Sequence, residues 1–308
     1  MEKALRNRLT FGPLMLAGLF LLLWLDHVAE RWTRPWMDRA THNPHRPGIQ
    51  GIGLLILLIS ILPLAVEELA VLFTAERVRP YRFIAGVGSG ALTVHAFLTQ
   101  FDWFEPIAAS TLVFVIVFVM IVAALRRAWA MQSQDAIVRM AGTVLATLYL
   151  GGLAWFLMAI RVKHSPHFTG STTMVLMILV VVKSTDIGAY FGGRALGRHK
   201  LIPWLSPGKT WEGLACGVVV SGVVGACIAP SLPHMHTAPW KGFILGVIIG
   251  ATGQAGDLLE SMMKRDAEVK DSGALVPGFG GILDIIDSPL FAAPFAYLLL
   301  SFFTHGSL

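Results

Sequence analysis

Nine stretches of predominantly apolar residues recur along the chain, and they limit its possible folds more than any other feature. A hydrocarbon core about 30 Å thick needs roughly 20 apolar residues for each helical span. Each stretch is close to that length, and short polar or basic segments separate them. The stretches are residues 9–27, 51–73, 83–100, 106–125, 137–160, 172–193, 213–232, 242–260 and 281–303. We therefore expect an all-α fold, a polytopic integral membrane protein with about nine transmembrane helices.

The composition excludes an ordinary soluble domain. Of the 308 residues, 55% are hydrophobic and 14% are charged, whereas soluble domains carry about 25% charged residues. Lysines and arginines are more frequent in the connections on the side of the N-terminus, and cytoplasmic loops carry such an excess. We expect the N-terminus inside and the C-terminus outside. The net charge of +5 follows from this bias and from basic loops, so it indicates no nucleic-acid partner.

The two halves of the chain differ in their polar residues. Residues 1–170 are mostly apolar stretches with short basic turns, and we expect them to form a transmembrane scaffold. Within this half, the arginine-rich segment 28–50 could be an interfacial helix rather than a loop. In residues 171–308 many acidic residues and glycines lie next to or inside apolar stretches. Charge in a bilayer is costly and marks functional sites, so we expect a catalytic half here, with cytoplasmic loops at 194–212 and 262–280.

Two other groups of polar residues leave alternatives open. Glu67 and Glu68 lie inside the second apolar stretch, where they are either functional or mark the point at which the helix leaves the membrane. Four loop histidines could bind a metal, but neither cysteine nor carboxylate accompanies them. These histidines are His164, His167, His234 and His236.

The sixth apolar stretch ends in "VVVKSTDIGAYFGGR", in which Lys183, Asp186 and Tyr190 are spaced to share one helix face. Lys183 and Asp186 could neutralise each other. The pair is either a structural ion pair that fixes helix packing or part of a functional site.

The next segment, "GRHKLIPWLSPGKTWEG", is a basic loop interrupted by prolines. Its "PGKT" is not a P-loop, because that motif needs a glycine five residues before Gly208 and position 203 is proline. What remains is a turn that enters a helix near Glu212, with Lys209 available to a phosphate. Backbone N–H groups at the helix start would also favour an anion. The alternative is an ordinary basic loop.

A polar stripe runs along the end of the eighth stretch. Asp257, Glu260, Ser261 and Lys264 are spaced to share one helix face from within the span to the cytoplasmic surface. Beyond them Arg265 and Lys270 alternate with Asp266, Glu268 and Asp271, as in a loop that handles a metal and phosphates. A solvated charged loop would explain residues 264–271 alone, but not the two carboxylates upstream.

The segment "GFGGILDIIDSP" places two carboxylates at the start of the ninth stretch. Gly278, Gly280 and Gly281 allow the backbone to approach a ligand closely, and Asp284 and Asp287 follow on one helix face. Without a partner, two carboxylates so close in a low dielectric would repel each other. A divalent cation removes this repulsion. Mg²⁺ prefers one or two carboxylates with water and phosphate oxygens, so these two residues and the nearby Asp257 suit a metal that carries a nucleotide.

Two stretches, "DIGAYFGGRALGRHKLIPWLSPGKTWEG" and "GDLLESMMKRDAEVKDSGALVPGFGGILDIIDS", resemble the bacterial CDP-diacylglycerol synthases, also called phosphatidate cytidylyltransferases. The resemblance covers residues 183–288, whereas residues 1–170 resemble the family only as a hydrophobic half. Phe279 and Ile285 replace a histidine and an arginine of the family signature, a difference that bears on rate and lipid substrate. The matching signature residues are Ser261, Lys264, Arg265, Lys270, Asp271, Gly273, Pro277, Gly278, Gly280, Gly281, Asp284 and Asp287.

The resemblance implies that CTP and phosphatidate give CDP-diacylglycerol and pyrophosphate in phospholipid biosynthesis, with Mg²⁺ as cofactor. No general base is needed, because phosphatidate is already ionised near neutral pH. The expected catalytic residues are Asp257, Asp284, Asp287, Lys264, Lys270 and Asp271. The expected substrate-binding residues are Ser206, Lys209, Thr210, Ser261, Arg265, Arg194, Gly280 and Gly281. The expected metal ligands are Asp257, Asp284 and Asp287, with Asp186 for a second cation.

The resemblance also implies a multi-pass protein of the inner membrane whose active site faces the cytoplasm, and it suggests a homodimer. Two alternatives stay open at this point. One is a CTP-dependent transferase or kinase that acts on an isoprenoid phosphate or alcohol. The other is an ion-coupled secondary transporter, since midplane carboxylates also occur there. A transporter, however, would not need basic residues beside the acids on one membrane face.

Overall fold

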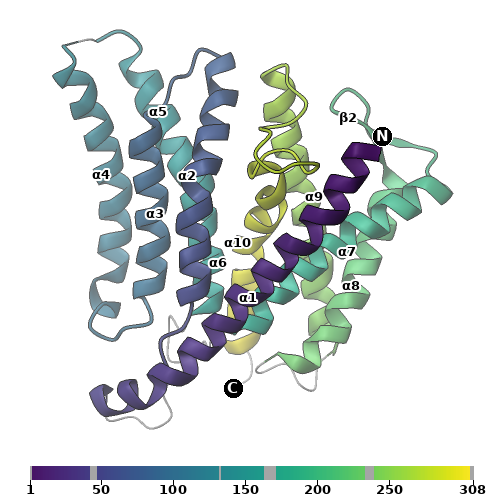
Figure 1. Cartoon of the computed structure of the whole chain (residues 1–308), viewed down its shortest axis with the longest axis horizontal. Helices are drawn as coiled ribbons and strands as arrows, with labels where there is room; N and C mark the ends of the chain where they lie inside the picture. Colours follow the sequence, from purple (N-terminus) through teal and green to yellow (C-terminus); the bar gives the residue numbers. More distant parts are fainter. Residues whose placement is uncertain (1, 42–46, 132, 163–170, 233–238, 306–308) are drawn as a thin grey trace. The chain divides into compact units, whose positions relative to one another are not determined.

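The computed structural model describes residues 2–41, 47–131, 133–162, 171–232 and 239–305. It is almost entirely helical (Figure 1). Short 3-10 turns occur at η1 (Glu105–Ile107) and η3 (Ala229–Ser231), and a π-helical turn at η2 (Thr147–Gly152). The α-helices are α1 (Glu2–Thr41), α2 (Ile52–Ala75), α3 (Arg82–Leu98), α4 (Ala108–Trp129), α5 (Ala136–Ala146), α6 (Leu153–Arg161), α7 (Thr172–Leu196), α8 (Trp211–Ile228), α9 (Pro239–Asp266) and α10 (Leu283–His305).

The predicted fold class, a polytopic helical membrane protein, is confirmed. Within the described ranges, eight helices are long and apolar enough to cross a membrane. The predicted third span, 83–100, corresponds to α3, which is apolar but has only 17 residues. Of the segment 28–50, considered above as an interfacial helix or a loop, residues 28–41 are helical and continue α1 without a break.

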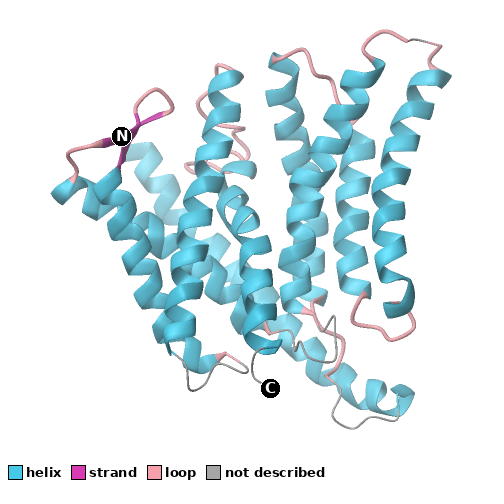
Figure 2. Ribbon diagram, turned by 180° about the vertical axis from the view of Figure 1, so that it is seen from behind, coloured by secondary structure: helices cyan, strands magenta, loops and turns pink. Residues whose placement is uncertain are grey.

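Part of the loop predicted at 194–212 forms a short antiparallel hairpin, drawn in magenta in Figure 2. Its strands are β1 (Lys200–Ile202) and β2 (Ser206–Thr210), with Lys200 opposite Thr210 and Ile202 opposite Ser206. Helix α8 begins directly after β2, at Trp211, as the sequence predicts for a helix starting near Glu212.

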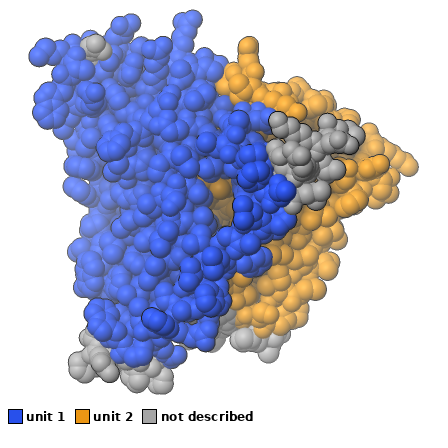
Figure 3. Space-filling view, in the orientation of Figure 1, with its two compact units in different colours: residues 1–165, 271–285 blue, residues 166–270, 286–308 orange. Residues whose placement is uncertain are grey.

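The chain divides into two compact units, coloured separately in Figure 3. Unit 1 comprises residues 1–165 and 271–285, and unit 2 comprises residues 166–270 and 286–308. Unit 1 thus contains the segment 271–285 in addition to the N-terminal residues. The expected division into a scaffold half and a catalytic half at residue 170 stays a prediction.

In unit 1, α3 contacts α2, α4, α5 and α6. Where the π-helical turn meets α3, Gly151 approaches so closely that a Cβ atom there would lie 2.4 Å from the Cα of Ser89. Residues of α2 such as Leu62, Ala65 and Leu69 are fully buried in this unit. These contacts explain how a helix of only 17 residues is held: its neighbours surround it.

A buried ion-pair cluster ties α1 to the end of α6 in unit 1. Arg161 Nε lies 2.5 Å from Asp26 Oδ2, and its Nη2 lies 2.9 Å from Glu30 Oε2. The side chains of Arg161 and Asp26 are fully buried. Asp26 and Glu30 stand one helical turn apart, so both can face the same guanidinium. Pairing with Arg161 offsets the free-energy cost of burying the two carboxylates of α1 in an apolar span.

In unit 2, α7, α8 and α9 pack along stripes of small residues. Gly213, Gly217, Ser221 and Gly225 of α8 are buried, and they recur at every fourth position. Small residues at this spacing let membrane helices approach closely, because packing replaces the hydrophobic driving force in lipid. A Cβ atom at Gly217 would lie 2.7 Å from the carbonyl oxygen of Thr185 in α7.

The substitution Gly217→Ala is therefore expected to destabilise the protein by about 2 kcal/mol, because overpacking of a close contact forces the helices apart. Gly90→Ala is the matched control: Gly90 is also inside a helix, but nothing lies within 4 Å of a Cβ placed there. This control should gain a little stability from helix propensity. Thermal unfolding of both variants in detergent measures the difference. Equal stabilities would contradict the close α7–α8 packing.

Candidate functional site

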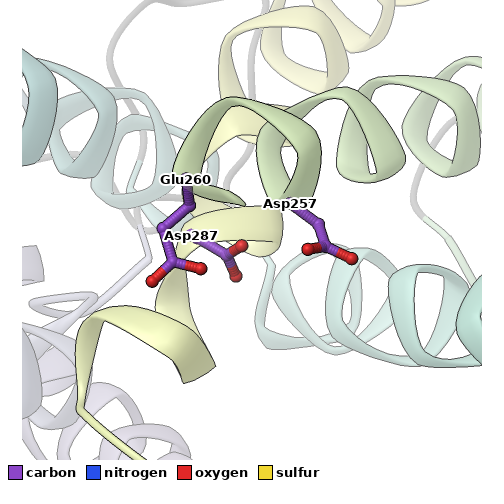
Figure 4. Close-up of side chains that lie close together, drawn as sticks. All are labelled: Asp257, Glu260 and Asp287. Atoms are coloured by element: carbon purple, nitrogen blue, oxygen red, sulfur yellow. The ribbon is translucent and has the colours of Figure 1, made fainter. Parts of the chain in front are cut away.

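Three carboxylates gather in unit 2, from α9 and α10. Asp257 and Glu260 are three residues apart on α9, and Asp287 lies in the second turn of α10. One oxygen from each lies within 4.8 Å of the other two (Figure 4). Glu260 is 1% exposed and Asp287 is 4% exposed, whereas Asp257 is half-buried. We call these three residues the acidic cluster.

A glycine explains why α10 can bring Asp287 so close to α9. Gly256 precedes Asp257, and a Cβ atom at Gly256 would lie 2.7 Å from the Cβ of Phe291 and 3.2 Å from the carbonyl oxygen of Asp287. Any larger residue would push α10 away. The absence of a side chain at Gly256 therefore sets the distance across the acidic cluster.

Two lysines approach the acidic cluster from different elements. Lys209 Nζ, near the end of β2, lies 2.8 Å from Asp257 Oδ2. Lys264 Nζ, one turn further along α9, lies 2.8 Å from Glu260 Oε2. The hydroxyl of Ser261 is 3.4 Å from Asp257 Oδ1. Each carboxylate of α9 thus faces a cation, which lowers the repulsion among the three acids, but two lysines do not neutralise three carboxylates.

The hairpin is fastened at both of its ends to α8. The Thr210 hydroxyl accepts a hydrogen bond from the backbone N–H of Gly213 at 3.1 Å, so Thr210 is the N-cap of α8. The Glu212 carboxylate accepts hydrogen bonds from the backbone N–H groups of Arg198 and His199 and lies 2.6 Å from Nδ1 of His199. These contacts hold β2, and with it Lys209, beside the acidic cluster.

Asp186 of α7 contacts α9 one turn before the acidic cluster. Its Oδ1 accepts a hydrogen bond from Gln254 Nε2 at 2.7 Å, and its Oδ2 lies 3.3 Å from Lys183 Nζ. The ion pair considered in the sequence analysis therefore forms. The acidic cluster as found in the described residues does not include Asp186.

Asp284 has a different environment from Asp287, although the sequence predicts both as metal ligands. Its Oδ2 accepts hydrogen bonds from the backbone N–H groups of Gly281 at 2.7 Å and Ser272 at 3.2 Å. Both groups belong to residues 271–281, which we call the glycine loop. This loop turns at Gly278 and Gly280, whose φ angles of 89° and 98° favour glycine. In unit 1, Asp284 thus closes the glycine loop onto the first turn of α10.

The remaining predicted residues lie at the hairpin, at the end of α9 and on the glycine loop. Arg265 Nε is 3.4 Å from the carbonyl oxygen of Leu205, and Arg194 Nη1 is 3.4 Å from the hydroxyl of Tyr190. The predicted residues Lys270 and Asp271 are exposed, Ser206 and Gly280 are half-buried, and Gly281 is buried. Phe279, which departs from the family signature, is 40% exposed on the loop. The four loop histidines His164, His167, His234 and His236 lie outside the described residues.

The model of the cytidylyltransferase family matches residues 49–303. The chain belongs to this family. The match extends through nearly all of the described helices, including much of the N-terminal half, where the sequence motifs gave no specific signal.

Curated relatives agree with membership of the cytidylyltransferase family. Phosphatidate cytidylyltransferase of Bacillus subtilis (strain 168) is 39% identical over 164 residues, which are 52% of this chain and 58% of that protein. Phosphatidate cytidylyltransferase of Brucella suis biovar 1 (strain 1330) is 44% identical over 135 residues, 43% of this chain and 48% of that protein. Uncharacterized protein YnbB of Escherichia coli (strain K12) is 38% identical over 161 residues, 52% of each chain. The chain spans about half the length of the curated relatives it matches.

Two acidic residues of this cytidylyltransferase family member stand out in the structure but are not among the predicted site residues. Glu260 belongs to the acidic cluster, and the sequence signal for it was its position three residues after Asp257. Glu68 contacts the glycine loop, and its only sequence signal was a carboxylate inside an apolar stretch.

Proposed function

We propose that this protein is a phosphatidate cytidylyltransferase, a nucleotidyltransferase that converts CTP and phosphatidate to CDP-diacylglycerol and pyrophosphate. The observation that carries the proposal is the acidic cluster flanked by Lys209 and Lys264 in a member of the cytidylyltransferase family. In the reaction, a phosphate oxygen of the lipid attacks the α-phosphorus of CTP. The bond from that phosphorus to the bridging oxygen breaks, and pyrophosphate leaves with the bonding electrons.

The donor set of the acidic cluster fits a divalent cation. It offers oxygen ligands only, which hard cations such as Mg²⁺ prefer, and ligand atoms of the three residues lie within 4.8 Å of one another. Asp257, Glu260 and Asp287 would hold the ion, with Asp186 as a ligand for a second one. When bound, Mg²⁺ would supply positive charge next to the phosphates and the departing pyrophosphate.

The basic residues offset the repulsion between two anionic substrates. Lys209 and Lys264 are paired with carboxylates, and phosphate oxygens can replace those partners when nucleotide binds. Lys270 and Arg194 are exposed and accessible to the triphosphate or the lipid phosphate. Such preorganised positive charge stabilises the transition state of phosphoryl transfer, in which little other chemistry is required of the protein.

Other predicted residues would bind substrate through hydroxyl or backbone groups. Ser206 and Ser261 are near the two lysines in the chain, and Arg265 follows Lys264. Thr210 would act by holding the start of α8, since its hydroxyl caps that helix. Gly280 would admit phosphate close to the loop backbone, and Asp271 begins the loop. Gly281, predicted with it, is buried against the Glu68 carboxylate.

The location follows from the chemistry of the lipid. Its acyl chains stay in the bilayer while its phosphate meets a water-soluble nucleotide, so the reaction belongs at the membrane surface. We assign the site to the cytoplasmic face of the inner membrane, with the N-terminus inside and the C-terminus outside, because lysine and arginine predominate in the connections on that side. A homodimer is part of this proposal on the strength of the family resemblance alone.

The test is to incubate purified protein with labelled CTP, Mg²⁺ and either phosphatidate or an isoprenoid phosphate. We expect a labelled CDP-lipid from phosphatidate, with one pyrophosphate released for each CDP-lipid formed, and no product after chelation of the metal. A labelled product from the isoprenoid phosphate only would shift the function to the other lipid class. Solute uptake into liposomes without CTP turnover would favour the transporter.

A further inference from the structure

Glu68 is a buried carboxylate in the apolar helix α2 of unit 1. It is 6% exposed and lies among buried apolar residues of α2 such as Val66 and Leu69. A carboxylate in such a setting is costly unless hydrogen bonds and positive charge stabilise it. The proposed cytidylyltransferase chemistry does not use Glu68, so its position needs another explanation.

Within the part of the chain that the structure describes, the hydrogen bonds of Glu68 lead to the glycine loop and to the start of α10. Its Oε1 accepts a hydrogen bond from the backbone N–H of Ile282 at 3.0 Å. Its Oε2 accepts from the N–H of Leu283 at 2.8 Å and from the hydroxyl of Ser272 at 3.2 Å. The N–H groups at a helix start have no partner within the helix, and a negative charge there also interacts favourably with the helix dipole. Glu68 therefore caps α10 from another helix.

Two glycines of the loop make room for this carboxylate. A Cβ atom at Gly273 would lie 2.4 Å from Glu68 Oε1, and one at Gly281 would lie 2.4 Å from Glu68 Oε2. Neither distance is compatible with a side chain. The close approach of the loop to Glu68 thus explains why glycine stands at both positions, independently of any contact with a substrate.

We propose that Glu68 is a positioning residue: it fixes the glycine loop and the first turn of α10, and thereby sets the place of Asp287 in the acidic cluster. This inference rests on the proposed function, because it assigns the acidic cluster to a metal. Leu283, whose N–H binds Glu68, and Asp287 are four residues apart, about one turn of the same helix. A shift of the helix start would therefore move the Asp287 carboxylate.

The neighbouring residue Glu67 supplies a matched control. It has the same side chain on the same helix, but it is about half exposed and pairs with Arg82 at 2.7 Å on the surface. Glu67→Gln removes a carboxylate from α2 without touching the loop. The test variant Glu68→Gln keeps the size of the side chain, but it removes the charge and puts an amide donor where backbone N–H groups need an acceptor.

The experiment uses the full-length protein in detergent and has two readouts that need no turnover. Hydrogen–deuterium exchange of residues 272–283 reports whether the loop and the start of α10 are held. Electron paramagnetic resonance of Mn²⁺ titrated into the protein reports the affinity of the cluster for a divalent cation. For Glu68→Gln we expect exchange at Ile282 and Leu283 to rise at least about tenfold and Mn²⁺ affinity to fall about tenfold, the scale seen when a group that orients metal ligands is lost. Glu67→Gln should change neither.

A milder variant keeps the inference testable if Glu68→Gln does not fold. Ser272→Ala removes one of the three hydrogen bonds, and we expect Mn²⁺ affinity to fall about threefold, the effect of one net hydrogen bond. Unchanged Mn²⁺ affinity in both variants, or faster exchange without weaker Mn²⁺ binding, would overturn the positioning role.

Activity separates this inference from the proposed function. The Mg²⁺ concentration for half-maximal CDP-lipid synthesis should rise about tenfold in Glu68→Gln, whereas a variant that is only partly folded would lose rate at an unchanged half-maximal concentration. If the wild-type protein forms no CDP-lipid but Glu68→Gln still weakens Mn²⁺ binding, the enzymatic proposal fails and the positioning role stands. If the wild-type protein is active and Glu68→Gln has the wild-type metal dependence, the positioning role fails alone.

Discussion

Replacing Asp287 by asparagine is expected to lower the rate of CDP-lipid synthesis at least about a thousandfold, equivalent to about 4 kcal/mol of transition-state stabilisation. Asp287 is a buried member of the acidic cluster, and an amide would neither neutralise a divalent cation nor hold it as tightly. The measurement is the initial rate at saturating CTP and phosphatidate over a range of Mg²⁺ concentrations. Size-exclusion chromatography in detergent verifies that the variant is folded.

Two further carboxylates make this prediction specific. Glu76 follows the end of α2 and is exposed, so Glu76→Gln should retain the wild-type rate. Asp284→Asn should lose about tenfold, because the backbone N–H groups of Gly281 and Ser272 would keep only a neutral acceptor. An equal, thousandfold loss for Asp284→Asn and Asp287→Asn would instead favour the pair of metal ligands that the sequence predicts.

The sequence predicts the helical architecture well because each span must bury its own backbone hydrogen bonds in lipid. Because of that constraint, the sequence of each span is a continuous apolar stretch, and this holds even for a helix as short as α3. The hairpin of β1 and β2 carries no such signature. β1 has three residues, and Pro203 and Pro207 interrupt the segment. Hydrogen bonds from the backbone N–H groups of Arg198 and His199 to the Glu212 carboxylate fix its position.

Within the site, local spacing indicates which residues share a helix face but not which groups their side chains contact. Asp284 and Asp287 share a face of one helix, and this spacing predicts a common metal. In the structure, however, two backbone N–H groups of the glycine loop bind the Asp284 carboxylate and so compete with a metal for it. The positions of these N–H groups depend on the φ angles of Gly278 and Gly280. Glu68 lies more than 200 residues from its hydrogen-bond partners, so local spacing cannot indicate these contacts. The sequence shows only that a carboxylate stands inside an apolar helix, where burying its charge costs free energy.

The largest effect on stability is expected for Arg161→Met. This change should destabilise the protein by about 4 kcal/mol, because it leaves the fully buried Asp26 and the partly buried Glu30 without their common cation. Unfolding by sodium dodecyl sulfate in mixed micelles, followed by circular dichroism, measures the free energy. Arg82→Met is the control. Its partner Glu67 is exposed, and such surface pairs contribute about 0.5 kcal/mol.

A second variant separates the cost of an unpaired charge from the loss of packing. In the double variant Arg161→Met with Asp26→Leu, the buried carboxylate is gone as well, and Glu30 keeps its hydrogen bond from Gln50 Nε2 at 3.1 Å. Replacement of a buried ion pair by apolar residues is often nearly neutral, so the double variant should regain at least about half of the lost stability. If the double variant is as unstable as Arg161→Met alone, the guanidinium stabilises α1 through its packing, and the electrostatic account of this cluster is wrong.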